Sequence, residues 1–482
     1  MGLVVILFWS LSIWSVKAAP TTRYVALQSA CGTQTPCYPD IQSALGDSDP
    51  GDEILVAGGT YTGVTAIYPI FAGSVYTQGI FIDKDITIRG GFTTTTWAFP
   101  NPVAYPTIID ALESGRVVYI KNGITVTLEG LNFINGRAFE TNPGYLVEGG
   151  GLLVNAANLT ISNCQVLSNT GIGGGGISND GFLTLTNSII SGNSAEAPIC
   201  CSSGGGIVND GELRIINSTI VSNTAGVGGG ISNSGTIRVF SATIQNNSAD
   251  NVGNGNGGGI LNFGAAELND SAVLANDSIF GAGIHNRGIF TITNSTLSDN
   301  WSYSGSVSGL ANSGGTVTLT NVTIVSNTYS IAGMEIDIGI QNNDSGGTIS
   351  AGNSIIAYNG AENCKGVIHS TGHNLEDSNW CGLSAAGDMT DTHPILDALD
   401  YYGGPTLVFG LLPGSPAIDT GDNAVCPTHD QRGVGRPVDG NDDAVADCDI
   451  GSFEFKPALP TPEPTSMPPV PLLYTYLPLL RR

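Results

Sequence analysis

The acidic stretch 439–449 is the part of the sequence best suited to hold a metal ion. It reads DGNDDAVADCD, so carboxylate and amide oxygens alternate around a glycine. Hard cations such as Ca²⁺ bind oxygen ligands of this kind. Asp439, Asn441, Asp443 and Asp447 are therefore candidate calcium ligands. The alternative is a solvated acidic loop, because the full ligand order and the closing Glu of a helix–loop–helix calcium site are absent.

Trp301 and Tyr303 are the candidates for binding a ligand through aromatic rings. They lie at the edge where insertions interrupt the sequence pattern, at 196–203, 250–256 and 329–336. Loops gathered at one edge of a repeat protein commonly form its binding surface. Exposed rings at this edge would stack on sugars, and packing within a loop is the alternative.

A repeat of 24 to 30 residues must position these side chains. Each run of glycines is followed by an apolar residue, at Leu152, Ile177, Ile207, Ile231, Ile260, Ile284, Leu310 and Ile340. This period indicates a solenoid, in which each unit buries its apolar side against its neighbours. Apolar residues alternate within the units, as at Leu183 and Leu185, which predicts strands rather than helices. Stacked coils of three short strands, about 4.8 Å apart, would form long parallel sheets.

Asparagines recur at three positions of the unit. The first column is Asn179, Asn209, Asn233, Asn262, Asn286, Asn312 and Asn342; the second is Asn163, Asn187, Asn217, Asn294 and Asn321; the third is Asn169, Asn193, Asn223, Asn247, Asn276, Asn300 and Asn327. Asn tolerates the left-handed backbone conformation and bonds to turn backbone groups. Stacked amides also bond to one another. The columns therefore predict the corners of the coils.

With these features, residues 149–359 resemble a right-handed parallel β-helix of the pectin-lyase-like superfamily. The G-G-G-I and S-x-x-x-N phrases are similar to repeats of polymorphic outer-membrane proteins. The resemblance implies an all-β, right-handed, single-stranded parallel β-helix. Residues 20–148 would supply an N-terminal cap, with a short helix in PDIQSAL, and irregular first coils.

The segment 360–455 departs from the repeat and resembles the choice-of-anchor region that follows such β-helices. The matching phrases are 372–375, 403–406, 412–419, 430–433, 436–437, 448–451 and 453–454. The resemblance implies a loop-rich C-terminal cap followed by an interchangeable surface-sorting tail. Residues 456–482, a Pro-rich spacer with a short apolar patch and two terminal arginines, fit such a tail.

Enzymes of this superfamily need clustered carboxylates, and the lyases also need a basic residue that takes a proton. Asp180 and Asp210 occupy equivalent turns, but Ser234 follows them, so the carboxylates do not continue as a column. His285 is alone in a strand and is expected at the surface. We therefore predict no catalytic residues. A carboxylate pair assembled from distant units is the alternative.

The composition and the cysteines indicate the compartment. Lys and Arg number 16 against 41 Asp and Glu, a net charge of −25 that disfavours nucleic-acid binding.

Residues 1–19 have the apolar core and small residues of a signal peptide, and no other segment is long enough to span a bilayer. Cysteines of an exported chain form disulfides, and proximity favours Cys31–Cys37, Cys364–Cys381 and Cys426–Cys448.

The sequence therefore predicts an exported, surface-attached β-helix protein without enzymatic activity. Its partner would be a glycan or cell-envelope material, and its function adhesion. Two alternatives stay open: a polysaccharide lyase or glycoside hydrolase, and a structural surface-layer or stalk protein.

Overall fold

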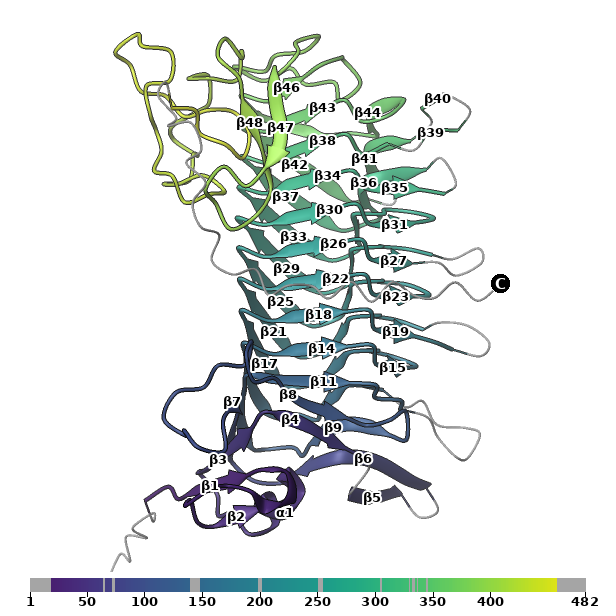
Figure 1. Cartoon of the computed structure of the whole chain (residues 1–482). Helices are drawn as coiled ribbons and strands as arrows, with labels where there is room; N and C mark the ends of the chain where they lie inside the picture. Colours follow the sequence, from purple (N-terminus) through teal and green to yellow (C-terminus); the bar gives the residue numbers. More distant parts are fainter. Residues whose placement is uncertain are drawn as a thin grey trace, which may run out of the picture.

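The computed structural model describes residues 19–63, 66–71, 74–138, 148–197, 202–249, 255–303, 306–328, 330–331, 334–335, 337–343 and 346–456. The predicted signal peptide up to residue 18 and the predicted tail from residue 457 lie outside these residues, as do the adjacent cysteines 200 and 201. The described chain forms a tall stack of coils (Figure 1). No helix among the described residues is long and apolar enough to cross a membrane.

Each coil contributes strands to long parallel sheets. Within the described residues, sheet A has 14 strands running from β2 (Cys37–Tyr38) to β45 (His369–Gly372). Sheet B has 12 strands, from β4 (Gly59–Thr62) to β46 (Leu375–Glu376), and sheet C has 12, from β5 (Ala66–Phe71) to β44 (Glu362–Lys365). The shorter sheet D has six strands, from β15 (Thr170–Gly171) to β35 (Trp301–Ser302). The chain is thus a parallel β-helix, as predicted.

One coil shows the path of the chain. It passes from β16 (Ile177–Asn179) in sheet C to β17 (Phe182–Thr186) in sheet A, then to β18 (Ile189–Ser191) in sheet B and β19 (Ser194–Ala195) in sheet D. The next coil starts with β20 (Ile207–Asn209), and the one after it with β24 (Ile231–Asn233).

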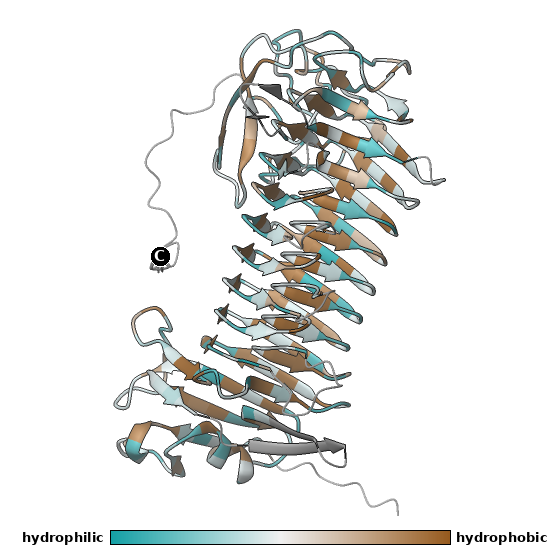
Figure 2. Cartoon of the chain, turned by 90° about the vertical axis from the view of Figure 1, so that its right-hand side faces the viewer, coloured by the Kyte–Doolittle hydropathy of each residue, from teal (hydrophilic) through white to brown (hydrophobic). Residues whose placement is uncertain are grey.

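The strand register stacks like residues over one another. Ile177 pairs with Ile207, and Ile207 pairs with Ile231. All three side chains are fully buried. Figure 2 shows the resulting pattern, in which apolar residues recur at the same place in successive strands. The predicted apolar stripes along the rod are therefore confirmed, and they supply the burial that no single coil achieves alone.

The asparagine columns mark the corners in two different ways. In the first and third columns each amide donates to the next, as from Asn179 Nδ2 to Asn209 Oδ1 at 2.6 Å and from Asn193 Nδ2 to Asn223 Oδ1 at 2.9 Å. The second column forms the corner between sheets A and B, where Asn187 has a φ of 49°. Asn tolerates this left-handed conformation better than most residues.

The N-terminal cap closes one end of the rod. Helix α1 (Ile41–Gly46) begins after Asp40, whose Oδ1 accepts a hydrogen bond from the Ser43 backbone N–H at 2.7 Å. Such an N-cap satisfies a donor that the first helical turn leaves free. Ile41, Ala44 and Leu45 are buried in the core below the first coils.

The C-terminal region folds back along the side of the rod instead of extending it. After β46 the chain forms the hairpin β47 (Leu396–Asp400) and β48 (Val408–Leu411), which lies against the upper coils in Figure 1. Ile450 and Phe453 of this region share a core with Ile355 on the outer face of sheet B. The coil corners bind it by hydrogen bonds, among them Asn321 Nδ2 to the Asp449 carbonyl at 3.1 Å.

Candidate functional site

A column of glycines lies at the corner between sheet C and sheet A. The packed coils leave no room for side chains there. A Cβ on Gly211 would lie 2.1 Å from the carbonyl oxygen of Gly181, and one on Gly235 would lie 2.1 Å from that of Gly211. Real Cβ atoms never approach backbone oxygens this closely. Backbone atoms without side chains therefore form the floor of the surface along this corner.

A shallow hollow of about 580 Å³ lies over this floor, and we call it the glycine groove. Its lining residues are Ala156, Asn158, Asp180, Gly181, Phe182, Asp210, Gly211, Glu212, Gly235 and Thr236. The Phe182 side chain is 60% exposed at its wall. The lining includes carboxylates, an amide and an aromatic ring but no Lys or Arg.

Glu148 lies outside the lining of the groove and adds a fourth carboxylate, on which the charges of Asp180 and Asp210 act. Its Oε2 accepts a hydrogen bond from Ser178 Oγ at 3.0 Å. Burial raises the pKa of Glu148, and the charges of Asp180 and Asp210 raise it further against the opposing effects of Ser178 and Arg116. Burial and the charge of Asp210 also raise the pKa of Asp180. A carboxyl with a raised pKa beside other carboxylates is the arrangement from which general acids are built.

Sequence patterns identified Asp180 and Asp210 only as turn residues and missed Glu148 and Phe182. A signal for Glu148 was present, because the same position holds Gly173, Ser203 and Val227 in the following coils. A single carboxylate in an otherwise small or apolar column is the feature that marks it.

Arg116 is held by backbone groups. Its guanidinium donates to the carbonyl oxygens of Gly149 at 2.9 Å and Glu148 at 2.6 Å, and its side chain is buried. Arg116 thus fixes the backbone at Glu148 and Gly149, and because an arginine keeps its proton in proteins it is no proton acceptor.

The structure brings the two predicted aromatic residues together on sheet D. The ring centroids of Trp301 and Tyr303 are 4.5 Å apart in an edge-to-face arrangement, and Tyr303 is 43% exposed. Asp277 Oδ2 accepts hydrogen bonds from the Tyr303 hydroxyl and, at 2.6 Å, from Ser248 Oγ. This pair lies on a different edge from the glycine groove, because sheet D follows sheet B along each coil. Its role in binding stays a prediction.

The four predicted calcium ligands each use one side-chain oxygen in a local hydrogen bond. Asn441 Oδ1 accepts from the Asp443 N–H at 3.0 Å, and Asp443 Oδ1 from the Val445 N–H at 2.8 Å. Asp447 Oδ1 accepts a hydrogen bond from Asn423 Nδ2 at 2.6 Å, and Asp439 Oδ2 accepts one from the Ala444 N–H at 2.9 Å. No group of three or more His, Cys, Asp or Glu side chains in the described part of the chain is arranged to hold a metal.

Three disulfides join the described cysteines in the predicted pairs, Cys31–Cys37, Cys364–Cys381 and Cys426–Cys448. Cys164 is a free, buried thiol, and burial raises its pKa to about 12. It is therefore an inert core residue.

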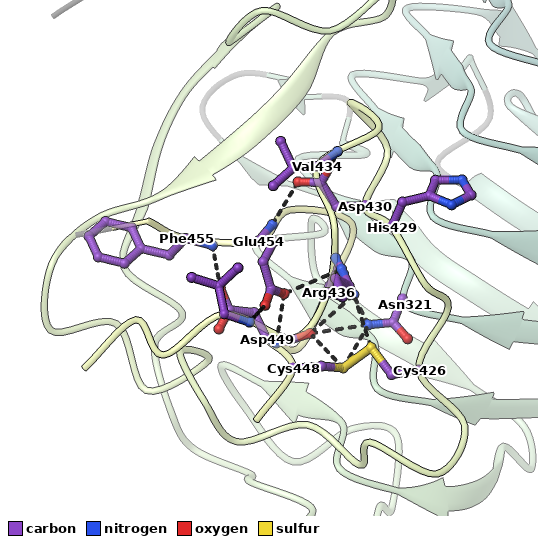
Figure 3. Close-up of polar contacts among 12 residues, drawn as sticks. Asn321, Cys426, His429, Asp430, Val434, Arg436, Cys448, Asp449, Glu454 and Phe455 are labelled. Atoms are coloured by element: carbon purple, nitrogen blue, oxygen red, sulfur yellow. Dashed lines mark hydrogen bonds and ion pairs between the residues drawn. A yellow bond between two sulfur atoms is a disulfide. The ribbon is translucent and has the colours of Figure 1, made fainter. Parts of the chain in front are cut away.

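Buried charges hold the C-terminal region together (Figure 3). Arg436 Nε lies 3.3 Å from Glu454 Oε2 with both side chains fully buried. Arg432 pairs with Asp430 at 2.6 Å. Asp449 joins this cluster through its carbonyl oxygen, 3.4 Å from an Arg436 nitrogen. Burial and the charge of Glu454 raise the pKa of Asp449 to about 8. The cluster draws its residues from the segments 430–433, 436–437, 448–451 and 453–454.

The expectation that His285 lies at the surface is wrong. It occupies the middle of β32 (Ile284–Asn286) and points away from the core, yet it is only 2% exposed. The ring of Phe280, from the loop before this strand, packs edge-to-face on it at 5.0 Å. Burial, with a contribution from Arg287, lowers its pKa to about 4.

Two solved structures resemble this chain at low sequence identity. No protein-family model and no curated protein matches the chain. Among solved structures, the crystal structure of pectate lyase Pel9A is 15% identical, with a TM-score of 0.46 over 91% of this chain and 97% of that chain. The crystal structure of alginate lyase from Paenibacillus sp. str. FPU-7 is also 15% identical, with a TM-score of 0.25 over 73% of this chain and 99% of that chain. The activities named belong to those two proteins.

Proposed function

We propose that this protein is an exported surface protein that binds an extended polysaccharide in the glycine groove without cleaving it. One observation carries the proposal: the exposed ring of Phe182 stands beside the carboxylates of Asp180 and Asp210 over a floor of bare backbone. An aromatic face offers apolar contact to a sugar ring, and carboxylates accept hydrogen bonds from its hydroxyls.

The groove also fits a ligand that is long. Equivalent positions recur at each coil, about 4.8 Å apart, so successive coils present repeated contacts along one line. The disulfides support export, because such bonds persist in oxidising compartments.

Charge narrows the class of polysaccharide. The groove lining has three carboxylates, of which Glu212 pairs with Arg238 at 2.8 Å, and the whole chain has a net charge of −25. A polymer of uronic acids would be repelled, whereas neutral or amino-sugar polymers would not.

Binding to a panel of neutral, amino and acidic polysaccharides tests the proposal. We expect retention on neutral or amino polymers, and about fivefold weaker binding by Phe182→Ala, since one ring contact contributes about 1 kcal/mol. Phe99→Ala is the matched control, because Phe99 is 81% exposed and lies outside the groove lining. Trp301→Ala tests the predicted aromatic pair in parallel. Unchanged binding by Phe182→Ala contradicts the assignment to this groove.

Hydrolysis is the second candidate, and the raised pKa of Glu148 beside Asp180 and Asp210 favours it. A protonated Glu148 would donate to a glycosidic oxygen while an ionised neighbour acted as base or nucleophile. A reducing-sugar assay on each bound polymer decides. Under this hypothesis Glu148→Gln abolishes product formation and leaves binding intact. A wild-type protein that binds but releases no sugar excludes it.

A further inference from the structure

The floor of the glycine groove continues upward into the next two coils. A Cβ on Gly264 would lie 2.0 Å from the carbonyl oxygen of Gly235, and one on Gly288 would lie 2.0 Å from that of Gly264. Gly235 itself belongs to the groove lining. The close stacking that forms the groove floor therefore leaves backbone without side chains as far as Gly288.

One border of this floor changes its chemistry along the rod. The backbone N–H of Phe263 donates to the Asn233 carbonyl oxygen at 2.8 Å, as that of Asp210 does to the Asn179 carbonyl oxygen at 2.9 Å. Phe263 and Asp210 therefore occupy one column, and Arg287 is its next member above Phe263. This border is acidic beside the groove, and it is aromatic and cationic in the two coils above.

The other border of the floor is formed by the first residues of the sheet A strands. The strand register connects Phe182 to Ile289 through four successive pairings, across Glu212, Thr236 and Ala265. Four coil spacings of about 4.8 Å separate Phe182 and Ile289 by about 19 Å along the rod. An extended chain of sugars that lies on the floor therefore passes both residues.

Phe263 and Ile289 are large apolar side chains that are exposed. The exposed fraction is 48% for Phe263 and 62% for Ile289. Exposed apolar side chains gathered at one place mark interaction sites, because their burial against a ligand is favourable.

The charge of Arg287 is also available to a ligand. Its guanidinium carbon lies 5.7 Å from the centre of the Phe263 ring, and the side chain is exposed. Within the described ranges Arg287 has no ion pair. A guanidinium has five N–H donors, which can bind the oxygens of a ligand beside the two apolar side chains.

We propose that the glycan-binding surface continues from the glycine groove to Phe263, Arg287 and Ile289, and that these three side chains bind an acetylamino group of the sugar chain. This inference rests on the proposed function, which supplies the polysaccharide. An acetylamino group has an apolar methyl and a carbonyl oxygen, which match the apolar side chains and the guanidinium donors.

The acidic end of the surface excludes the main competing chemistry. A sugar carboxylate would also pair with Arg287, but a polymer of such sugars would meet the carboxylates of Asp180 and Asp210 on the same floor and be repelled. An acetylamino group is neutral, so it contacts Arg287 without this penalty. The ligand class is therefore a neutral polymer of N-acetylated amino sugars.

Calorimetric titration with two neutral, β-1,4-linked hexasaccharides tests the inference. The hexamer of N-acetylglucosamine carries acetylamino groups, whereas the hexamer of glucose lacks them. We expect the wild-type protein to bind the N-acetylglucosamine hexamer about fivefold more tightly, which corresponds to about 1 kcal/mol. Phe263→Ala and Arg287→Gln should each remove this preference, and circular dichroism checks that both variants are folded.

A second pair of Phe and Arg on sheet A provides the matched control. The guanidinium carbon of Arg214 lies 5.4 Å from the centre of the Phe240 ring, and neither residue belongs to the groove lining. Phe240→Ala and Arg214→Gln should keep the preference for the N-acetylglucosamine hexamer. An equal loss in these controls, or an unchanged preference in Phe263→Ala and Arg287→Gln, would overturn the inference.

Phe182→Ala separates this inference from the proposed function. It should weaken the binding of both hexamers about fivefold, because Phe182 lies in the groove itself. If Phe182→Ala weakens binding while Phe263→Ala and Arg287→Gln keep the preference, the groove stands and its extension is refuted. If Phe182→Ala binds both hexamers as wild type does, the proposed function is refuted.

Discussion

We expect the buried histidine of sheet C to make the stability of the rod sensitive to acid. His285 Nε2 lies 3.0 Å from Ser313 Oγ, and its Nδ1 has no hydrogen-bond partner among the described residues. The ring is enclosed by the loop that carries Phe280. Protonation would place an imidazolium in this enclosed site without a carboxylate to compensate it, which is why its pKa falls to about 4.

The direction of the pH effect on stability follows from the pKa of His285 in the folded chain and its pKa in the unfolded chain. Above pH 6.5 the histidine is neutral in both the folded and the unfolded chain, so it does not change the free energy of unfolding. As the pH falls from 6.5 to 4, the unfolded chain takes up a proton that folded His285 does not, so the free energy of unfolding decreases. With pKa values of about 6.5 and about 4, the loss at pH 4.5 is about 2.5 kcal/mol.

Replacing His285 by Leu removes this loss, and Leu261 occupies the paired position in the preceding coil. Urea unfolding at pH 7.5 and pH 4.5 measures it: the wild-type protein should lose about 2.5 kcal/mol more than His285→Leu. His369→Leu, at an exposed histidine, is the control and should behave as wild type. Equal losses in wild type and His285→Leu would refute the reasoning.

Three further changes test the coil architecture. Asn223→Ala should lower the free energy of unfolding in urea by about 3 kcal/mol or more, because it leaves several buried partners in the amide ladder without a hydrogen bond. A decrease below about 1 kcal/mol would contradict this prediction. Gly211→Ala should cost about 2–3 kcal/mol by overpacking, whereas Gly46→Ala, with nothing within 4 Å, should be neutral or slightly stabilising. Replacing Cys426 and Cys448 by Ser removes the disulfide that closes a loop with a sequence separation of 22. This should destabilise the C-terminal region by about 3 kcal/mol, and limited proteolysis there should become faster.

The periodic part of the fold could be predicted because each coil repeats the same physical solution. Ile177 and its equivalents are buried, and the asparagines lie at corners, since every unit must bury one face and turn at the same places. The short helix in PDIQSAL and the three disulfides could be predicted from local sequence signals and from proximity along the chain.

The parts that could not be predicted depend on contacts between different coils or on loops. Alternation indicated that His285 points away from the core, but it gave no information on Phe280, which covers it. Glu148 and Asp180 belong to different coils, so their proximity depends on the stacking register.

The uniform register of the central coils makes the rod a molecular ruler. Coils beginning at Ile177, Ile207 and Ile231 present the same pairing to the coil above and to the coil below. Gain or loss of one whole coil would preserve every interface and change the separation of the two capped ends by about 4.8 Å. The spacing between the N-terminal cap and the C-terminal region is therefore adjustable in fixed increments, by duplication or deletion of a single unit of sequence.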